Sequence, residues 1–182
     1  MTRERGFGVR SFIVRWAIPA IVIGVVAGAA VPAALRGLGV AWDTNRMSLP
    51  WLFERVFAWM AYLALAGSVV YGLMLSTRLL DAIAHRPISF TLHKDLAAFG
   101  IAFASVHAAL LLLDTSVGFT PLQVLVPGLS AYEPVALAFG QVALALAIVV
   151  LASFYLRKRM SQRAWRALHY LTFLSFIGTT VH

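Results

Sequence analysis

The sequence predicts an all-α fold, a bundle of helices that cross a membrane. Of its 182 residues, 61% are hydrophobic and only 12% are charged, and the mean hydropathy is +0.85, a balance that soluble domains do not show. The chain contains no cysteine, so disulfides and thiolate metal ligands are excluded. Any metal ligand must therefore come from His, Met or carboxylate side chains.

Apolar runs of helix length define one bundle over residues 12–182, preceded by a basic tail at residues 1–11 that we expect in the cytoplasm. The five spans are predicted at about residues 12–35, 51–76, 92–114, 134–156 and 166–182. A cleaved signal peptide is an alternative for the first span, although the apolar run exceeds the ~7–15 residues of a signal core.

The segments between the spans carry the residues that interrupt helices. Residues 36–50 contain Gly, Asp, Asn and Pro and are predicted to form a loop. Residues 77–91 are predicted to connect the second and third spans, because Pro87 ends any helix that continues from the second. The segment after Asp114 contains three prolines, so we expect it to lie along the interface or to cap the bundle.

The distribution of positive charge predicts the orientation. With the N-terminus in the cytoplasm, twelve of the fifteen Lys and Arg residues lie on the inner side, which follows the positive-inside rule. The third and fifth spans then both run from inside to outside. The formal charge of +8 is explained by this topology, and no nucleic-acid partner is predicted.

Four histidines in these two parallel spans are the candidate functional residues. His93 and His107 are fourteen residues apart in the third span, and His169 and His182 are thirteen apart in the fifth. These spacings correspond to ~20 Å along a helix, so one histidine of each span lies at an inner level and one at an outer level. An ionisable side chain inside a span is a functional candidate by default. Two neutral imidazoles at each level suit the iron of haem b, so two non-covalent haems are predicted. The alternative for any one histidine is a packed, hydrogen-bonded core residue.

Helix geometry favours one pair more than the other. Fourteen residues return to within about 40° of the same face, whereas thirteen leave His182 about 140° from His169. We therefore expect a bend or a π-bulge near Gly178 and the Thr179–Thr180 pair, or else a rotated haem plane. Gly100, midway between His93 and His107, is expected to admit a porphyrin edge or another helix.

Basic residues near the inner histidines are candidates to pair with the two anionic propionates of the inner haem. They are Arg86, Lys94, Arg163 and Arg166. Positive-inside bias alone is the alternative explanation for them. His85, in the connection before Pro87, is interpreted as a solvated histidine.

These residues resemble the ferric reductase-like transmembrane domain, a family that includes ferric-chelate reductases, NADPH oxidases and many bacterial membrane cytochromes b. The resemblance covers about residues 51–182. It rests on H-x13-H in the third span, H-x12-H two spans later, W-R-x-L-H-Y at residues 165–170 and PLQVLVP in the loop between the third and fourth spans. It implies a six-span bundle that passes electrons one at a time, with His93 and His169 on the inner haem and His107 and His182 on the outer haem. The related haem subunit of the bacterial methionine sulfoxide reductase system lacks the first histidine, so the chain is more similar to the two-haem branch.

The chain departs from that family in two respects. It contains no FAD or NAD(P)H domain and no Gly-rich dinucleotide motif, so we expect a separate donor, either a cytoplasmic flavin reductase or a quinol. It also stops at the expected outer ligand, which predicts either a fragment that lacks a sixth span or a weak outer site.

The predicted function is electron transfer across a bacterial plasma membrane, from an inner donor to an outer acceptor. The chain would be the membrane component of an oxidoreductase, and no catalytic residue is predicted, because iron with two histidine ligands has no free coordination site. One alternative is another di-haem cytochrome b that is linked to quinol or ascorbate. Another is a non-redox transporter or assembly subunit.

Overall fold

The computed structural model describes residues 18–37, 49–79, 86–115 and 117–182. The basic tail at 1–11, residues 12–17 of the first predicted span, most of the loop at 36–50, and His85 lie outside these ranges. The predicted all-α class is confirmed. The described elements are α2 (Ile18–Gly37), α3 (Leu49–Ser76), α4 (Arg86–Leu110), α5 (Pro121–Leu125), α6 (Pro134–Leu156), the short 3₁₀ helix η3 (Arg157–Arg159) and α7 (Gln162–Val181).

Two of the described helices are long and apolar enough to cross a membrane, Pro50–Ser76 and Pro134–Arg159. They correspond to the second and fourth predicted spans. The helices that bear the histidines, α4 and α7, are less apolar in composition. Length and hydropathy thus mark two candidate spans among the described residues and leave the other three predicted spans without this support.

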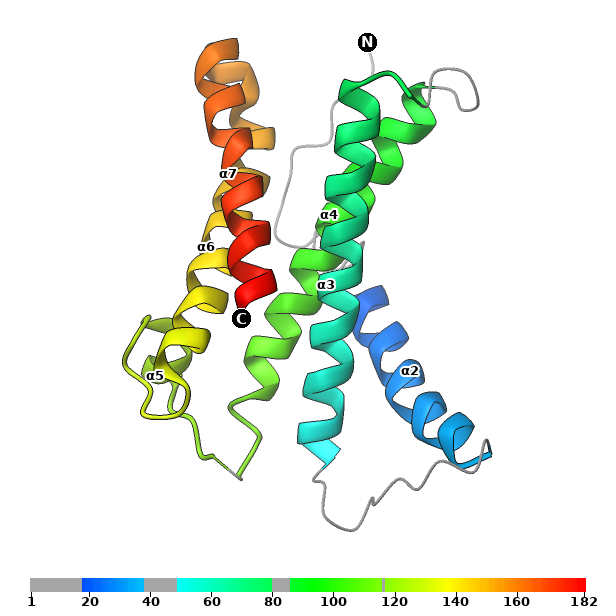
Figure 1. The fold of residues 1–182 in the computed structure, drawn as a ribbon, viewed down its shortest axis with the longest axis vertical. Helices are drawn as coiled ribbons and strands as arrows, with labels where there is room; N and C mark the ends of the chain where they lie inside the picture. The colour runs from blue at the N-terminus through cyan, green and yellow to red at the C-terminus, as the bar shows by residue number, and fades with distance from the viewer. Residues whose placement is uncertain (1–17, 38–48, 80–85, 116) are drawn as a thin grey trace.

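The helices form two antiparallel hairpins (Figure 1). α3 packs along α4 and α6 packs along α7, while far fewer contacts cross between the hairpins. α2 leans against α3, where Gly24 lies against the ring of Phe57. The core of the first hairpin contains Phe57, Ala61, Ala102 and Phe103. α4 and α7 face each other across the groove between the two hairpins.

Three helix ends differ from the approximate limits predicted for the third and fifth spans. α4 begins at Arg86 rather than at residue 92, and it ends at Leu110 rather than at 114. Pro87 stands in its first turn, where the missing N–H breaks no helical hydrogen bond and the fixed φ suits the helix. α7 begins at Gln162 rather than at 166, because the Ser161 side chain accepts a hydrogen bond from the Ala164 N–H and caps the helix.

The segment that follows α4 caps one end of the bundle. α5 begins with a capping box in which Thr120 and Gln123 bond each other's backbone. The side-chain Nε2 of Gln141, on α6, donates to the carbonyls of Gln123 and Val124 at 2.7 and 2.9 Å. Val124 is buried. These contacts support the expected cap, and the position of the segment along a membrane interface stays a prediction.

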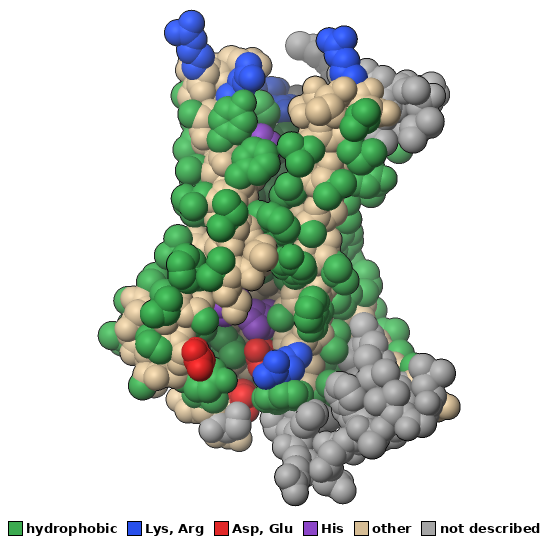
Figure 2. Space-filling view, in the orientation of Figure 1, with side chains coloured by type: hydrophobic (Ala, Val, Ile, Leu, Met, Phe, Trp, Pro, Cys, Tyr) green, Lys and Arg blue, Asp and Glu red, His purple; other side chains and the backbone are tan. Residues whose placement is uncertain are grey.

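Side-chain chemistry divides the surface into bands (Figure 2). Apolar side chains cover the middle of the molecule in this view, and Lys and Arg gather at the end where α6 turns into α7. Acidic side chains appear near the opposite end, with a basic side chain beside them. In this view an apolar band separates two charged ends.

Candidate cofactor-binding site

The four histidines form two facing pairs between α4 and α7. The ring centroids of His93 and His169 are 6.1 Å apart with 74° between the ring planes. Those of His107 and His182 are also 6.1 Å apart, at 70°. The two helices must therefore run in the same direction. Figure 2 shows histidine at both ends of the groove between the hairpins.

The spacing of the rings is that of two imidazoles on opposite sides of one metal ion. A bond between a transition-metal ion and an imidazole nitrogen is about 2 Å long. The centre of the ring lies about 1 Å beyond the nitrogen, so two rings in line across the metal have centroids about 6 Å apart. Both pairs have this spacing.

The Nδ1 atoms of three of these histidines donate to main-chain carbonyls. His93 donates to Ser68 O at 2.8 Å, and the Ser68 hydroxyl in turn donates to His93 O at 3.1 Å. His107 donates to Glu54 O at 3.1 Å, and a carboxylate oxygen of Glu54 lies 3.6 Å from the same nitrogen.

His182 completes this set, because its Nδ1 donates to Ala136 O at 2.8 Å. A carbonyl oxygen can only accept, so the proton must be on Nδ1 in each of the three rings. Nε2 is then left with a free lone pair. Histidines that bind metals are typically oriented by a hydrogen bond of this kind from the other ring nitrogen.

His169 is oriented by an aromatic ring instead. The indole of Trp165, one turn earlier on α7, stacks on the His169 imidazole with centroids 5.3 Å apart and 21° between the planes. From the sequence, Trp165 was identified only as the first residue of the W-R-x-L-H-Y motif. Its stacking role follows from the i, i+4 spacing on a helix.

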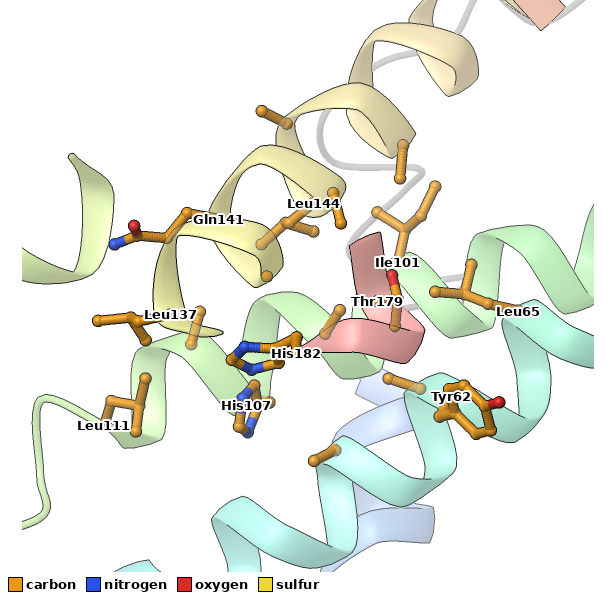
Figure 3. Close-up of a pocket in the computed structure, with 18 of the residues that line it drawn as sticks. Tyr62, Leu65, Ile101, His107, Leu111, Leu137, Gln141, Leu144, Thr179 and His182 are labelled. Carbon is orange, nitrogen blue, oxygen red and sulfur yellow. The ribbon is translucent and has the colours of Figure 1, made fainter. Parts of the chain in front are cut away.

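The outer pair borders a large cavity (Figure 3). Its volume is about 680 Å³, within the ~300–1,000 Å³ typical of sites for small molecules and cofactors. Figure 3 shows His107 and His182 side by side in this cavity, on α4 and α7. Its walls are mostly apolar and include Tyr62, Leu65, Ile101, Leu137 and Leu144. Volume, donor atoms and ring spacing all fit a haem here.

The inner pair borders a smaller cavity of about 140 Å³, which is below that range. Its donor atoms and ring spacing fit a haem, but a flat macrocycle would need the two hairpins to move apart. Few contacts join the hairpins, so little packing opposes this movement. Leu65, Ile101 and Ala147 border both cavities and form the wall between them.

Two glycines make room for histidine rings. A Cβ built on Gly140 would lie 2.6 Å from Nδ1 of His182, and one on Gly72 would lie 3.0 Å from Cε1 of His93. Sequence reasoning missed both glycines. Neither is near a histidine in the chain, so no local pattern could have revealed them.

The expected partners of the propionates are only partly placed at the site. Lys94 lines the inner cavity. Arg163 and Arg166 are exposed on α7 and line neither cavity. Arg86 begins α4, and its side chain lies outside the described part of the structure.

Two further expectations are resolved by the backbone. Gly100 admits a neighbouring helix, since a Cβ there would lie 2.7 Å from Cγ of Leu65 on α3. The helix shows no distortion near Gly178, since α7 is α-helical from Gln162 to Val181 and the His182 N–H bonds Gly178 O. Of the expected alternatives, the rotated haem plane stays a prediction. Side-chain directions take up the angular offset: His169 stacks on Trp165, whereas His182 is drawn onto α6 by Ala136 O.

No protein-family model, curated protein or solved structure matches the chain. Within the described ranges, no three or more His, Cys, Asp or Glu side chains gather into a metal-binding group. The two histidine pairs, each of which offers two imidazole ligands, are thus the feature on which a function can be proposed.

Proposed function

We propose that this protein is a membrane cytochrome b of the ferric reductase-like type, which carries electrons across a membrane through two haems. The observation that supports this most directly is the double pairing of α4 and α7 histidines at 6.1 Å. Three of the four rings also have Nδ1 bonded to a carbonyl and Nε2 free for a metal.

The protein's part is to bind, orient and shield. His93 and His169 would hold the inner haem, and His107 and His182 the outer one, through Nε2. Bound haem b supplies a reversible one-electron couple at its iron. The apolar cavity walls exclude water and favour the less charged state of a site. Because two histidines would bind each iron, no catalytic residue is proposed in the chain, and an acceptor would receive its electron at the edge of the outer site.

The membrane arrangement that accompanies this proposal has five spans and a cytoplasmic N-terminus, in a bacterial plasma membrane. The two apolar helices of the structure and the Lys and Arg at one end support it. His93 and His169 lie toward that basic, inner end. The chain would be the membrane component of an oxidoreductase, with a separate flavin reductase or quinol as inner donor and an acceptor on the outer side.

A reduced-minus-oxidised visible spectrum of the purified protein, with haem quantified as its pyridine complex, tests the proposal. We expect two low-spin haems b per chain. His93→Ala or His169→Ala should remove the inner haem alone, and His107→Ala or His182→Ala the outer haem alone. His85→Ala, which alters the one histidine outside the pairs, is the matched control and should retain both.

The absence of haem from wild-type protein made in a host that supplies it would refute the proposal. That result would favour the alternative function, a non-redox transporter or assembly subunit. If the protein contains bound quinone, and if substitution of one histidine pair leaves the haem content unchanged, a quinol-linked cytochrome with different ligands is favoured instead.

A further inference from the structure

We propose that Glu54 is a positioning residue of the outer site, whose carboxylate lowers the reduction potential of the haem bound by His107 and His182. This inference rests on the proposed function and adds a residue that the histidine pattern does not include. Three observations support it: the contact between the carboxylate and the His107 ring, the burial of that contact, and a neutral side chain at the equivalent place beside the inner pair.

The Glu54 carboxylate acts on a ring that is already fixed in place. Nδ1 of His107 donates to the main-chain carbonyl of Glu54 at 3.1 Å, and Oε1 of the same residue lies 3.6 Å from that nitrogen. The carbonyl therefore sets the direction of the ring, while the carboxylate, just beyond hydrogen-bond length, acts through its charge. The side chains of His107 and Glu54 are only 15% and 16% exposed. Charges interact more strongly where water is excluded, so this charge is weakly screened.

A negative charge at this place stabilises oxidised iron. Reduction of a bound haem b adds one electron at the iron, so the positive charge of the site falls by one. The carboxylate thus stabilises the oxidised form more than the reduced form. A carboxylate beside the other nitrogen of a ligating histidine also makes that histidine a more basic ligand. Both effects lower the potential, since hydrogen bonding and charge around the axial ligands are what tune it.

The inner pair has a neutral group at the equivalent place. Ser68 follows Glu54 by fourteen residues on α3, and its carbonyl accepts the Nδ1–H bond of His93 at 2.8 Å. Its side-chain hydroxyl lies 3.1 Å from the same nitrogen and carries no net charge. The two levels thus share one kind of ring support and differ in the charge beside it. The carboxylate therefore makes the outer haem a stronger reductant toward its acceptor than a neutral side chain would.

Removal of the charge with the ring support left intact tests this role. In full-length protein carrying His93→Ala, so that only the outer haem is loaded, the midpoint potential is measured by spectroelectrochemical titration with Glu54 and with Glu54→Gln. Glutamine keeps the shape of the side chain and removes its charge, and the main-chain carbonyl that orients His107 is present in both proteins. Arg55 and Asp114, whose charges also act on Glu54, are unchanged.

Glu54→Gln should raise the outer potential by about 59 mV, which corresponds to about a tenfold change in the equilibrium constant of a one-electron couple. The control is the same substitution in His182→Ala protein, where only the inner haem is loaded. That haem lies ~20 Å away along the helix, so its potential should not change. An outer potential that stays or falls, or an equal rise in both proteins, would refute the role of Glu54.

Two further variants keep the outcomes separate. Glu54→Asp retains a carboxylate, so its outer potential should rise less than that of Glu54→Gln, and an equal rise would show that the charge is not responsible. If Glu54→Gln fails to fold or to retain haem, Glu54→Met removes the same charge with an apolar side chain, and the same rise is expected. Failure of wild-type protein to take up any haem would refute the proposed function itself, a result distinct from these.

Discussion

Three of the four paired histidines are supported by backbone rather than by side chains. The carbonyls of Ser68, Glu54 and Ala136 accept their Nδ1–H bonds. A carbonyl is present whatever side chain the residue bears, so this support depends on where α3 and α6 lie and not on residue type at those positions. Ser68 and Glu54 also add side-chain contacts, through the Ser68 hydroxyl at His93 and the Glu54 carboxylate 3.6 Å from Nδ1 of His107.

The space for each ring, by contrast, depends on residue type. His182 lies over Gly140 so closely that any Cβ would meet Nδ1, Cγ and Cε1 of the ring within 2.8 Å. A glycine within a helix costs about 0.5–1 kcal/mol relative to alanine. Its presence here is explained by the ring that it accommodates.

Gly140→Ala should displace the His182 ring and break its bond to Ala136 O, so we expect loss of the outer haem with the inner haem retained. Haem per chain should fall from two to about one, as measured by the pyridine haemochrome. Gly67→Ala is the control, since its Cβ would meet Leu96 at an ordinary 3.5 Å, and it should retain both. Full outer haem in the Gly140 variant would show that the ring can pair from another position.

At the scale of elements, α3 and α4 share one repeat. Ser68 and Glu54 are fourteen residues apart on α3, and the histidines that they bond, His93 and His107, are fourteen apart on α4. Fourteen residues are two heptads, after which a helix in a coiled-coil-like pair presents the same face to its partner. The antiparallel register of the hairpin therefore places a supporting carbonyl at both levels at once.

α6 and α7 approach each other through small residues. Gly178 is buried, and a Cβ there would lie 3.1 Å from Cβ of Ala143 and 3.2 Å from the carbonyl of Phe139. The Ser175 hydroxyl donates to Ala143 O at 2.8 Å. Close backbone approach through small residues with a hydroxyl bond between helices is typical of packing in membranes.

Gly178→Leu should force α7 away from α6, because the added side chain would meet backbone that cannot rotate aside. Overpacking of this kind costs about 1–3 kcal/mol, which we expect as a lower melting temperature in detergent. Ile177→Leu alters the next residue, which is 57% exposed, and should melt as wild type does. Equal melting temperatures for the two variants would show that α6 and α7 are packed less closely than these distances indicate.

On the scale of the whole molecule, the two hairpins are well packed within themselves and poorly packed against each other. Both histidine pairs lie across this weak junction, with one ligand on α4 and one on α7. A cofactor bound by both members of a pair would join the hairpins. Cofactor binding and tertiary stability are then linked.

Haem-loaded protein should accordingly unfold at a higher temperature than haem-free protein, and variants that bind a single haem should lie between them. A ligand at a thousandfold excess over its Kd stabilises the folded state by about 4 kcal/mol. Hydrogen–deuterium exchange should locate the effect on the facing sides of α4 and α7, with α3 less affected. If haem changes neither melting nor exchange, the hairpins are held together by other contacts.

Much of this could be predicted from the sequence, because it depends on local pattern. Apolar runs of helix length predict the all-α class. Ionisable residues within such runs identify His93, His107, His169 and His182 as candidates, and the fixed rise of a helix assigns them to two levels. The parallel direction of α4 and α7 also followed from the alternation of the predicted spans, of which they are the third and fifth.

Tertiary structure decided whatever depends on residues distant in the chain. Contacts between helices decide which carbonyls accept from three of the four rings, why glycine stands at 72 and 140, and why the two cavities are unequal. Two local expectations also changed in the folded chain. Pro87 lies in the first turn of α4 rather than in a connection, and α7 is a continuous α-helix without the expected bulge. A sequence pattern gives the direction of a side chain relative to its own helix, but the atoms that it meets are set by how the helices pack.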